Sequence, residues 1–183
     1  QSMLSWYNKI YTIRSISLPY FNVARATEDG ELGEDHSKES HIIPRAIKAA
    51  INKKEPFLLY GDDYDTPDGT CLRDYVHVVD LVRAHVLALK KLLVGVESTV
   101  YNLGSKKPIW NKEIILTVKK VTGIDFPVKI MNRRLGDPAV IYADNSKAKK
   151  ELNWEPKFDS LEKIIETSWK WHKNHKKYRW LYE

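Results

Sequence analysis

The spacing of apolar residues divides the chain into alternating helices and strands. Apolar positions three and four residues apart predict helices over residues 3–11, 41–51, 81–92, 114–121, 146–152 and 161–173. Short apolar or alternating runs predict strands over residues 13–18, 57–60, 75–79, 99–103 and 128–131. We therefore expect an α/β fold.

Polar residues mark the starts of several predicted helices. Asp80 and Asn111 are expected to cap the helices that follow them, and Asp159 with Glu162 forms a capping box before the last helix. His85 lies on the apolar stripe of the helix after Asp80. We expect a hydrogen-bonded core histidine there rather than a catalytic group.

Residues 61–80 form a long, shaped loop that leads into a strand. Its Gly-Asp and Asp-Gly pairs and Pro67 favour turns, because Gly accepts positive φ and Asp bonds its own backbone. A loop of this length usually has a function, and Arg73 offers a guanidinium fork suited to phosphate or carboxylate. An alternative is that Arg73 only pairs with Asp74 or another neighbour to fix the loop.

Two further segments carry candidate binding residues. Asn22 follows the predicted strand 13–18, and ligands gather at the carboxyl ends of strands in open α/β sheets. It could instead simply close a turn. Arg133, Arg134 and Asp137 surround Gly136, and Arg can grip a pyrophosphate while Asp accepts from ribose hydroxyls. The alternative for this segment is a surface loop of ion pairs.

The acidic, glycine-rich residues 27–38 are predicted to form a loop. Glu34, Asp35, His36, Glu39 and His41 could be drawn as a metal cluster. Their irregular spacing and the transition from loop to helix argue against it. We therefore expect no metal.

Composition narrows the class of protein. With 183 residues and 43% hydrophobic residues, the chain can bury a core. The single cysteine, Cys71, excludes an intrachain disulfide, and no apolar run approaches the roughly 18 residues of a membrane span. No signal-like segment is present, so we expect a cytoplasmic protein without a membrane partner.

The net charge of +6 is compatible with nucleic acid, but the basic residues are spread along the chain. One basic cluster, residues 170–179, is mixed with Trp169, Trp171, Tyr178 and Trp180, which could stack on bases. Such a mixture is more typical of an amphipathic helix that runs into a solvated tail. We expect no nucleic-acid partner.

Four motifs in order resemble the C-terminal half of the UDP-glucose 4-epimerase family, which belongs to the extended short-chain dehydrogenase/reductases. They are LPYFNVA at 18–24, GDDYDTPDGTCLRDYVHVVDL at 61–81, YNLG at 101–104 and RRLGDPAVIYADNSKA at 133–148. The resemblance implies that residues 1–183 are a UDP-sugar-binding portion whose strands belong to an incomplete Rossmann sheet. Pro19 and Arg25 depart from the family pattern, which has Arg and Gly at these places.

The resemblance also implies contacts with the substrate. Asn22 would face the sugar and diphosphate, and the backbone around His41 and Ile42 would touch the ligand. The strand from Leu58 to Tyr60 would read the uracil, with Tyr60 packed on its ring.

Further contacts come from the two arginine-bearing loops. Arg73 and Arg134 would bind the diphosphate, and Asp137 would bind the ribose. Ile141 falls where the family leaves room beside the sugar, and a branched residue there favours a plain hexose over an N-acetylated one. Tyr20 and Phe21 would lie near the nicotinamide of NAD.

The family inverts carbon 4 of UDP-glucose or UDP-galactose by passing a hydride to NAD and back, which needs a dinucleotide site and a base. The eight glycines form no G-x-G-x-x-G or G-x-x-G-x-x-G pattern, and none of the ten tyrosines has a Lys four residues later. We therefore expect an N-terminal NAD-binding half to be absent from this sequence. The chain alone would be inactive and without NAD, and the complete enzyme would form a homodimer.

Two other hypotheses share the UDP contacts. The chain could be a stand-alone UDP-sugar-binding module, which would bind UDP without NAD. It could also belong to a sister enzyme, such as a UDP-glucuronate or UDP-xylose epimerase or a decarboxylase.

An incomplete sheet predicts low stability for the isolated chain. Ile16, Leu18, Tyr101 and Leu103 would be the residues most exposed by the missing strands. We therefore expect marginal stability or aggregation, measured by size-exclusion chromatography and thermal melting. A soluble monomer that unfolds in one cooperative transition would contradict this.

Overall fold

The computed structural model describes residues 2–24, 26–52 and 55–179. Arg25, one of the two departures from the family pattern, and Trp180 lie outside the described residues. Among the described helices, none combines the length and apolar character needed to cross a membrane.

Helices and short strands alternate along the chain, so the predicted α/β class is confirmed. The helices are α1 (Ser2–Tyr11), α2 (Ile42–Asn52), α3 (Val78–Leu93), α4 (Asn111–Thr122), α5 (Ser146–Leu152) and α6 (Leu161–Arg179). The strands are β1 (Ile16–Ser17), β2 (Asn22–Ala24), β3 (Phe57–Tyr60), β4 (Leu72–Arg73), β5 (Tyr75–His77), β6 (Thr99–Val100), β7 (Ile109–Trp110) and β8 (Val128–Met131).

The described strands form four pairs. Three pairs are parallel, β1 with β6, β2 with β5 and β3 with β8, and β4 pairs with β7 in the antiparallel sense. The parallel partners lie far apart in sequence, as in β3 and β8, where Phe57 is in register with Val128. Parallel pairing requires a crossover, and each of the three connections contains at least one helix.

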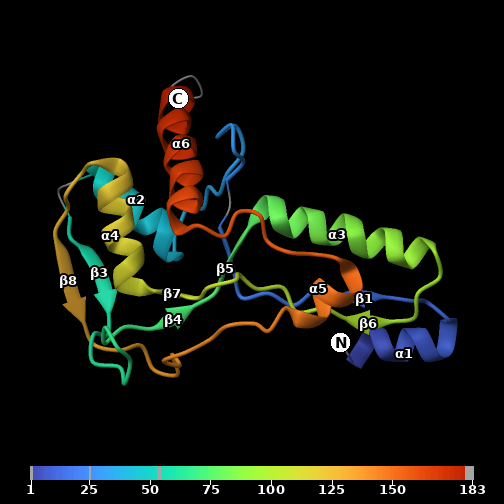
Figure 1. Cartoon of the computed structure of the whole chain (residues 1–183). Helices are drawn as coiled ribbons and strands as arrows, with labels where there is room; N and C mark the ends of the chain where they lie inside the picture. Colours follow the sequence, from blue (N-terminus) through green and yellow to red (C-terminus); the bar gives the residue numbers. More distant parts are fainter. Residues whose placement is uncertain (1, 25, 53–54, 180–183) are drawn as a thin grey trace.

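The elements gather into two groups that differ in their cores (Figure 1). In one group α2, α4 and α6 pack beside the β3–β8 pair, with Ile47, Ile114 and Ile165 buried among them. In the other group α3 and α5 lie beside β1 and β6, and the buried residues include Leu81 and Trp154. Strands β4, β5 and β7 cross between the two groups.

The second core corrects the expectation for the strands at 13–18 and 99–103. Tyr101 and Leu103 are only 2% and 0% exposed, because they share a buried cluster with Trp154. Ile16 and Leu18 are half-buried against the same cluster. These four side chains are therefore not the most exposed apolar groups of the chain.

About half of the exposed large apolar groups lie on two helices. On α3 the buried apolar residues are Leu81, Ala84 and Ala88. Only Leu81 of the predicted stripe is buried, and the other predicted positions were Val82, His85, Leu89 and Leu92. His85 is exposed rather than in the core, and its Nδ1 bonds the carbonyl of Leu81 at 2.8 Å. The exposed apolar residues of α3 and α1 are Val82, Val86, Leu89, Leu93, Met3, Leu4, Trp6, Tyr7, Ile10 and Tyr11.

Three predicted helix caps are replaced by neighbouring residues. His77, not Asp80, caps α3, because the N–H of Val79 donates to the His77 Nδ1 at 3.2 Å. The cap position of α4 is Trp110, and Asn111 is the first helical residue. Before α6 the N–H of Lys163 donates to the Ser160 hydroxyl at 3.2 Å.

The Asp159 carboxylate, which was predicted to cap α6, pairs instead with Lys106 at 3.3 Å. This ion pair lies on the surface, since the two side chains are 54% and 37% exposed. Asp159 therefore links the segment before α6 to the loop after β6 and plays no part in a helix cap.

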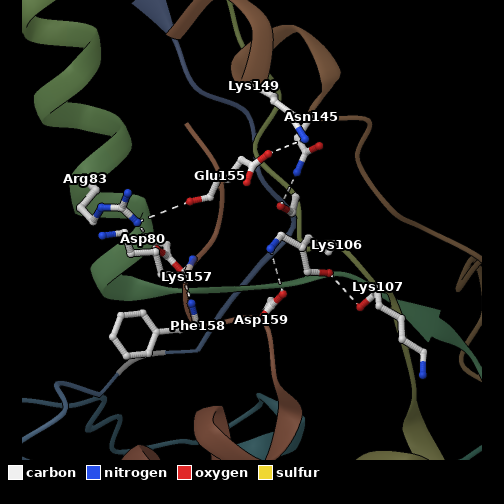
Figure 2. Close-up of polar contacts among 12 residues, drawn as sticks. Asp80, Arg83, Lys106, Lys107, Asn145, Lys149, Glu155, Lys157, Phe158 and Asp159 are labelled. Atoms are coloured by element: carbon white, nitrogen blue, oxygen red, sulfur yellow. Dashed lines mark hydrogen bonds and ion pairs between the residues drawn. The ribbon is translucent and has the colours of Figure 1, made fainter. Parts of the chain in front are cut away.

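Asp80 joins α3 to the segment that precedes α6 (Figure 2). Its Oδ2 accepts from the N–H groups of Lys157 and Phe158 at 2.9 and 2.8 Å, and its Oδ1 accepts from Arg83 at 2.7 Å. The backbone carbonyl of Asp80 accepts from the Trp154 indole at 2.9 Å. A fully buried carboxylate is stable only when its oxygens are bonded in this way.

Replacing Asp80 should weaken the fold strongly. In Asp80→Ala two part-buried N–H groups lose their acceptor and Arg83 loses its charged partner, so we expect a loss of about 3 kcal/mol in the free energy of unfolding. Urea unfolding followed by circular dichroism measures it. The matched control is Asp159→Ala, which breaks only the surface pair with Lys106 and should leave the midpoint unchanged. Equal effects of the two substitutions would contradict the role assigned to Asp80.

Candidate functional site

A cavity of about 330 Å³ opens where β2, β3 and the start of α2 meet the loops after β4 and β8. The residues predicted to contact a substrate come from five separate segments of the chain. Eight of the nine line this cavity, namely Asn22, His41, Ile42, Leu58, Tyr60, Arg73, Arg134 and Asp137.

The other predicted residues lie elsewhere. Ile141 is not among the lining residues, and its N–H donates to the carbonyl of Leu72 at 3.0 Å alongside β4. Tyr20 and Phe21 are 42% and 53% exposed just before β2 and do not line the cavity either. Pro19 does not interrupt the β1–β6 ladder, because only its carbonyl is used, accepting from Leu103 at 2.8 Å.

Asn22 is held by a distant segment rather than by a local turn. It is the first residue of β2, and its side-chain nitrogen donates to the backbone carbonyl of Asp74 at 3.0 Å. Its own N–H reaches the same carbonyl at 3.3 Å. The side chain is therefore tied to the residue before β5 at the edge of the cavity, and its amide oxygen accepts no hydrogen bond from the described residues.

Arg73 lies at the end of β4 and pairs across the cavity loops with Asp137. It also donates to the carbonyls of Leu72 at 2.8 Å and Ala139 at 3.4 Å. Asp74 is not its partner, because the Asp74 carboxylate accepts from the N–H groups of Ser105 and Ala143. Arg73 thus fixes the loop that carries Asp137 and places one cationic group at the wall.

Arg134 and Tyr60 form a cation–π pair in the cavity lining. The Arg134 guanidinium lies 4.2 Å from the centre of the Tyr60 ring, and Arg45 lies 5.8 Å from the same centre. Among the described residues Arg134 makes no ion pair, so its donors are available. Arg133 is directed elsewhere, because it pairs with the exposed Asp63 at 2.7 Å.

Several lining residues were missed by the sequence reasoning. Arg45 lies three residues after Ile42 in α2, so the two side chains share a face of the helix. This spacing could have predicted Arg45 from the sequence. Tyr75, Asn111, Ser168 and His172 come from β5, α4 and α6, and their local sequence gives no sign that these elements meet. Arg45 matters most, since it adds a third guanidinium to Arg73 and Arg134.

The electrostatics of the cavity favour an anionic ligand that also carries hydroxyl groups. Burial raises the pKa of the Tyr75 phenol and lowers the pKa of the His172 imidazole, so both groups are neutral at pH 7. The charged groups of the lining include the guanidiniums of Arg45, Arg73 and Arg134 and the carboxylates of Glu34 and Asp137. Guanidiniums bind phosphates, and carboxylates accept from hydroxyls.

The comparisons with known proteins agree on one family. A family model described as the NAD dependent epimerase/dehydratase family matches residues 1–104. A UDP-glucose 4-epimerase from Lactobacillus helveticus is 48% identical over 97% of this chain, which covers 54% of that relative. The chain thus spans about half the length of the curated relatives it matches.

Solved structures give the same result. A crystal structure of a UDP-glucose 4-epimerase has a TM-score of 0.91 and 46% identity, over 96% of this chain and 53% of that one. Another, from Bifidobacterium longum in complex with NAD+ and UDP, has a TM-score of 0.83 and 36% identity, over 94% of this chain and 51% of that one.

The fold and cavity define an α/β protein with a site suited to a phosphorylated ligand. The chain belongs to the NAD dependent epimerase/dehydratase family. The resemblance to UDP-glucose 4-epimerases that the four motifs predicted is confirmed over nearly the whole chain.

Removing the carboxylate of Asp137 should lower the free energy of unfolding. The Arg73 and Asp137 side chains are 11% and 32% exposed, so Asp137→Ala leaves a mostly buried guanidinium without its charged partner. We expect a loss of about 1–2 kcal/mol, between the values of surface and buried pairs. Urea unfolding measures it. Asp63→Ala, which breaks the exposed pair with Arg133, is the control and should not shift the midpoint.

Proposed function

We propose that this chain is the UDP-hexose-binding part of a UDP-glucose 4-epimerase. The observation that carries the proposal is the convergence of Arg45, Arg73 and Arg134 with Asp137 on one cavity. Such a set suits a diphosphate joined to a ribose. The similarity to UDP-glucose 4-epimerases over 97% of the chain supports the choice of ligand.

In this proposal each part of the ligand meets a different segment. Arg134, whose guanidinium forms no ion pair with any described residue, holds the diphosphate, and Arg73 adds positive charge beside it. Asp137 accepts from the ribose hydroxyls while it remains paired with Arg73. The diphosphate competes with Asp137 for Arg73, so we assign the larger share of phosphate binding to Arg134.

The base and the sugar occupy the two ends of the cavity. The uracil lies along β3, between Leu58 and Tyr60, where Arg45 already reaches the Leu58 carbonyl at 3.5 Å. The sugar lies near Asn22 and the start of α2 at His41 and Ile42. Tyr60 is stacked by Arg134, so the uracil would meet the other face or the edge of its ring.

The sugar itself is proposed to be an unsubstituted hexose, glucose or galactose, in keeping with a role in galactose metabolism. The branched Ile141 was expected to limit space for an N-acetyl group, but its position outside the cavity lining weakens that argument. The choice of hexose therefore rests on the similarity to UDP-glucose 4-epimerases.

We also propose that the NAD-binding and catalytic parts come from residues outside this chain, which is then the C-terminal half of a cytoplasmic enzyme and inactive alone. The residues of this chain do not fit a dinucleotide by themselves, because they include no glycine-rich phosphate turn and no Tyr-x-x-x-Lys pair. NAD supplies the hydride chemistry when it is bound.

Two features of the surface support a missing neighbour. The exposed apolar residues of α1 and α3 form faces that a partner segment would cover, such as Trp6 at 62% and Leu89 at 56% exposure. Strands β1 and β6 have only two residues each and pair only with one another among the described strands. Tyr20 and Phe21, exposed beside them, are the proposed contacts to the nicotinamide. The complete enzyme is proposed to be a homodimer.

Binding of UDP to the purified protein tests the proposal. We expect Arg134→Ala to weaken the affinity for UDP at least about tenfold in isothermal titration calorimetry, since a hydrogen bond to a charged group is lost. The matched control is the adjacent Arg133→Ala, whose guanidinium bonds Asp63 outside the cavity lining. It should bind UDP within about twofold of the unchanged protein.

The other outcomes separate the hypotheses. Absence of UDP binding, or equal losses in the two arginine variants, would overturn the proposal. Conversion of UDP-glucose to UDP-galactose by this chain alone with added NAD would contradict the assignment of catalysis to other residues. Tighter binding of UDP-xylose or UDP-glucuronate than of UDP-glucose would favour a sister enzyme. A natural protein no longer than these residues that binds UDP would favour a stand-alone module.

A further inference from the structure

The loop between β2 and α2 brings four potential metal ligands together. Glu34, His36, Glu39 and His41, here called the Glu-His cluster, each offer one ligand atom, and these atoms lie within 4.8 Å of one another. The Nδ1 of His36 is 3.0 Å from Glu34 Oε1 and 3.8 Å from Glu39 Oε1. The Nδ1 of His41 contacts the same Glu34 oxygen and lies 3.6 Å from Glu39 Oε1.

The irregular spacing that argued against a metal in the sequence does not keep these residues apart. The loop folds back onto α6, where the Trp171 indole donates to the Glu34 carbonyl at 3.1 Å. Near the start of the loop, the N–H of Thr27 donates to the carbonyl of Leu32 at 2.9 Å and closes a turn. Ligands on a folded loop need no helical periodicity, because the turns set their positions.

Two carboxylates of the cluster are buried, which requires compensation. The Glu34 and Glu39 side chains are each 4% exposed. Glu39 Oε1 accepts from the His41 N–H at 2.8 Å. Its Oε2 is buried and has no hydrogen-bond partner in the part of the chain that the structure describes. A buried carboxylate oxygen without a partner costs free energy that a bound cation would offset.

Protonated histidines compensate this charge less well than a metal ion. The rings of His36 and His41 are 5.6 Å apart, so two imidazolium ions would repel one another. One imidazolium beside a neutral ring in its Nδ1–H tautomer would let both rings donate to Glu34, but it would leave one of the two carboxylate charges uncompensated. Neither arrangement supplies a partner for Glu39 Oε2.

Two of the histidines packed around the cluster are already engaged. On α6 the Nδ1 of His172 bonds the Ser168 carbonyl at 2.8 Å, and burial lowers its pKa. His175 pairs with Asp35 at 3.1 Å. The positive charge of Lys48 on α2 helps to lower the pKa of His172, but no ion pair between Lys48 and the cluster is present among the described residues.

We propose that the Glu-His cluster binds a single Zn²⁺ ion. Two imidazole nitrogens and two carboxylate oxygens are a ligand set that zinc accepts in tetrahedral geometry. Four ligand atoms about 2.1 Å from one ion lie about 3.4 Å from each other. The distances of 3.0, 3.6 and 3.8 Å in the cluster fall on both sides of this value, and the ligand atoms spread over up to 4.8 Å, so the side chains would rotate to reach this geometry.

The ion would fasten the loop to the first turn of α2 beside the cavity. His41 directly precedes α2, and both Glu34 and His41 belong to the cavity lining. Zinc would therefore order one wall of the cavity without being part of its anion-binding side, where Arg73 and Arg134 lie. The inference rests on the cluster alone and does not depend on the proposed function.

Titration of the metal-free purified protein with ZnCl2 tests the inference. We expect saturation at one equivalent in isothermal titration calorimetry and a rise in the melting temperature. His36→Gln and His41→Gln should each weaken the binding at least about tenfold, since removing even a supporting residue of a zinc site costs that much. The matched control is His85→Gln on the exposed side of α3, which should bind Zn²⁺ like the unchanged protein.

A second readout guards against variants that fold poorly. Glu39→Gln keeps the size of the side chain and removes its charge, so it should keep the circular dichroism spectrum and lose Zn²⁺ affinity. Co²⁺ in place of Zn²⁺ should give the visible absorption of a tetrahedral site, and this absorption should be absent in Glu39→Gln. No saturable binding, or the same affinity in His36→Gln and His85→Gln, would overturn the inference.

Discussion

Two buried carboxylates from one short segment hold distant parts of the chain together. Asp74 accepts from the N–H groups of Ser105 and Ala143 at 2.7 and 2.9 Å. Asp80 accepts from Lys157 and Phe158 at 2.9 and 2.8 Å. Both side chains are almost fully buried, so their charge is tolerable only while these bonds persist. The positions of three loops therefore depend on two residues.

This arrangement also positions the cavity. Arg73 directly precedes Asp74, and the loop that carries Asp137 runs on to Ala143, which Asp74 binds. Close packing around Asp74 leaves no room for a side chain at residue 104, because a Cβ on Gly104 would lie 2.5 Å from Asp74 Oδ2. The segments that carry Arg73 and Asp137 are thus positioned by the bonds that the Asp74 carboxylate accepts from backbone N–H groups.

Local chemistry predicted most elements but not their neighbours. The helix predicted over 146–152 and the strands over 57–60 and 128–131 have the observed bounds. The prediction that Tyr101 and Leu103 would be exposed was wrong, because they share a buried cluster with Trp154, which lies some fifty residues later in the sequence. The predicted cap of α3 was wrong, because the Asp80 carboxylate accepts from the N–H groups of Lys157 and Phe158. His77 caps the helix in its place. Each error arose where a residue distant in sequence competed for a side chain.

The sequence by itself determined the α/β class, the turns of residues 61–80 and the family resemblance, because apolar spacing and motif residues act over a few positions. Only the tertiary structure decided that Arg73 pairs with Asp137 and that Arg45 joins Arg134 at Tyr60. The same is true of the Glu-His cluster, whose four residues meet only when the loop folds back onto α6. Contacts between distant residues leave no periodic signal, since they depend on how whole elements pack.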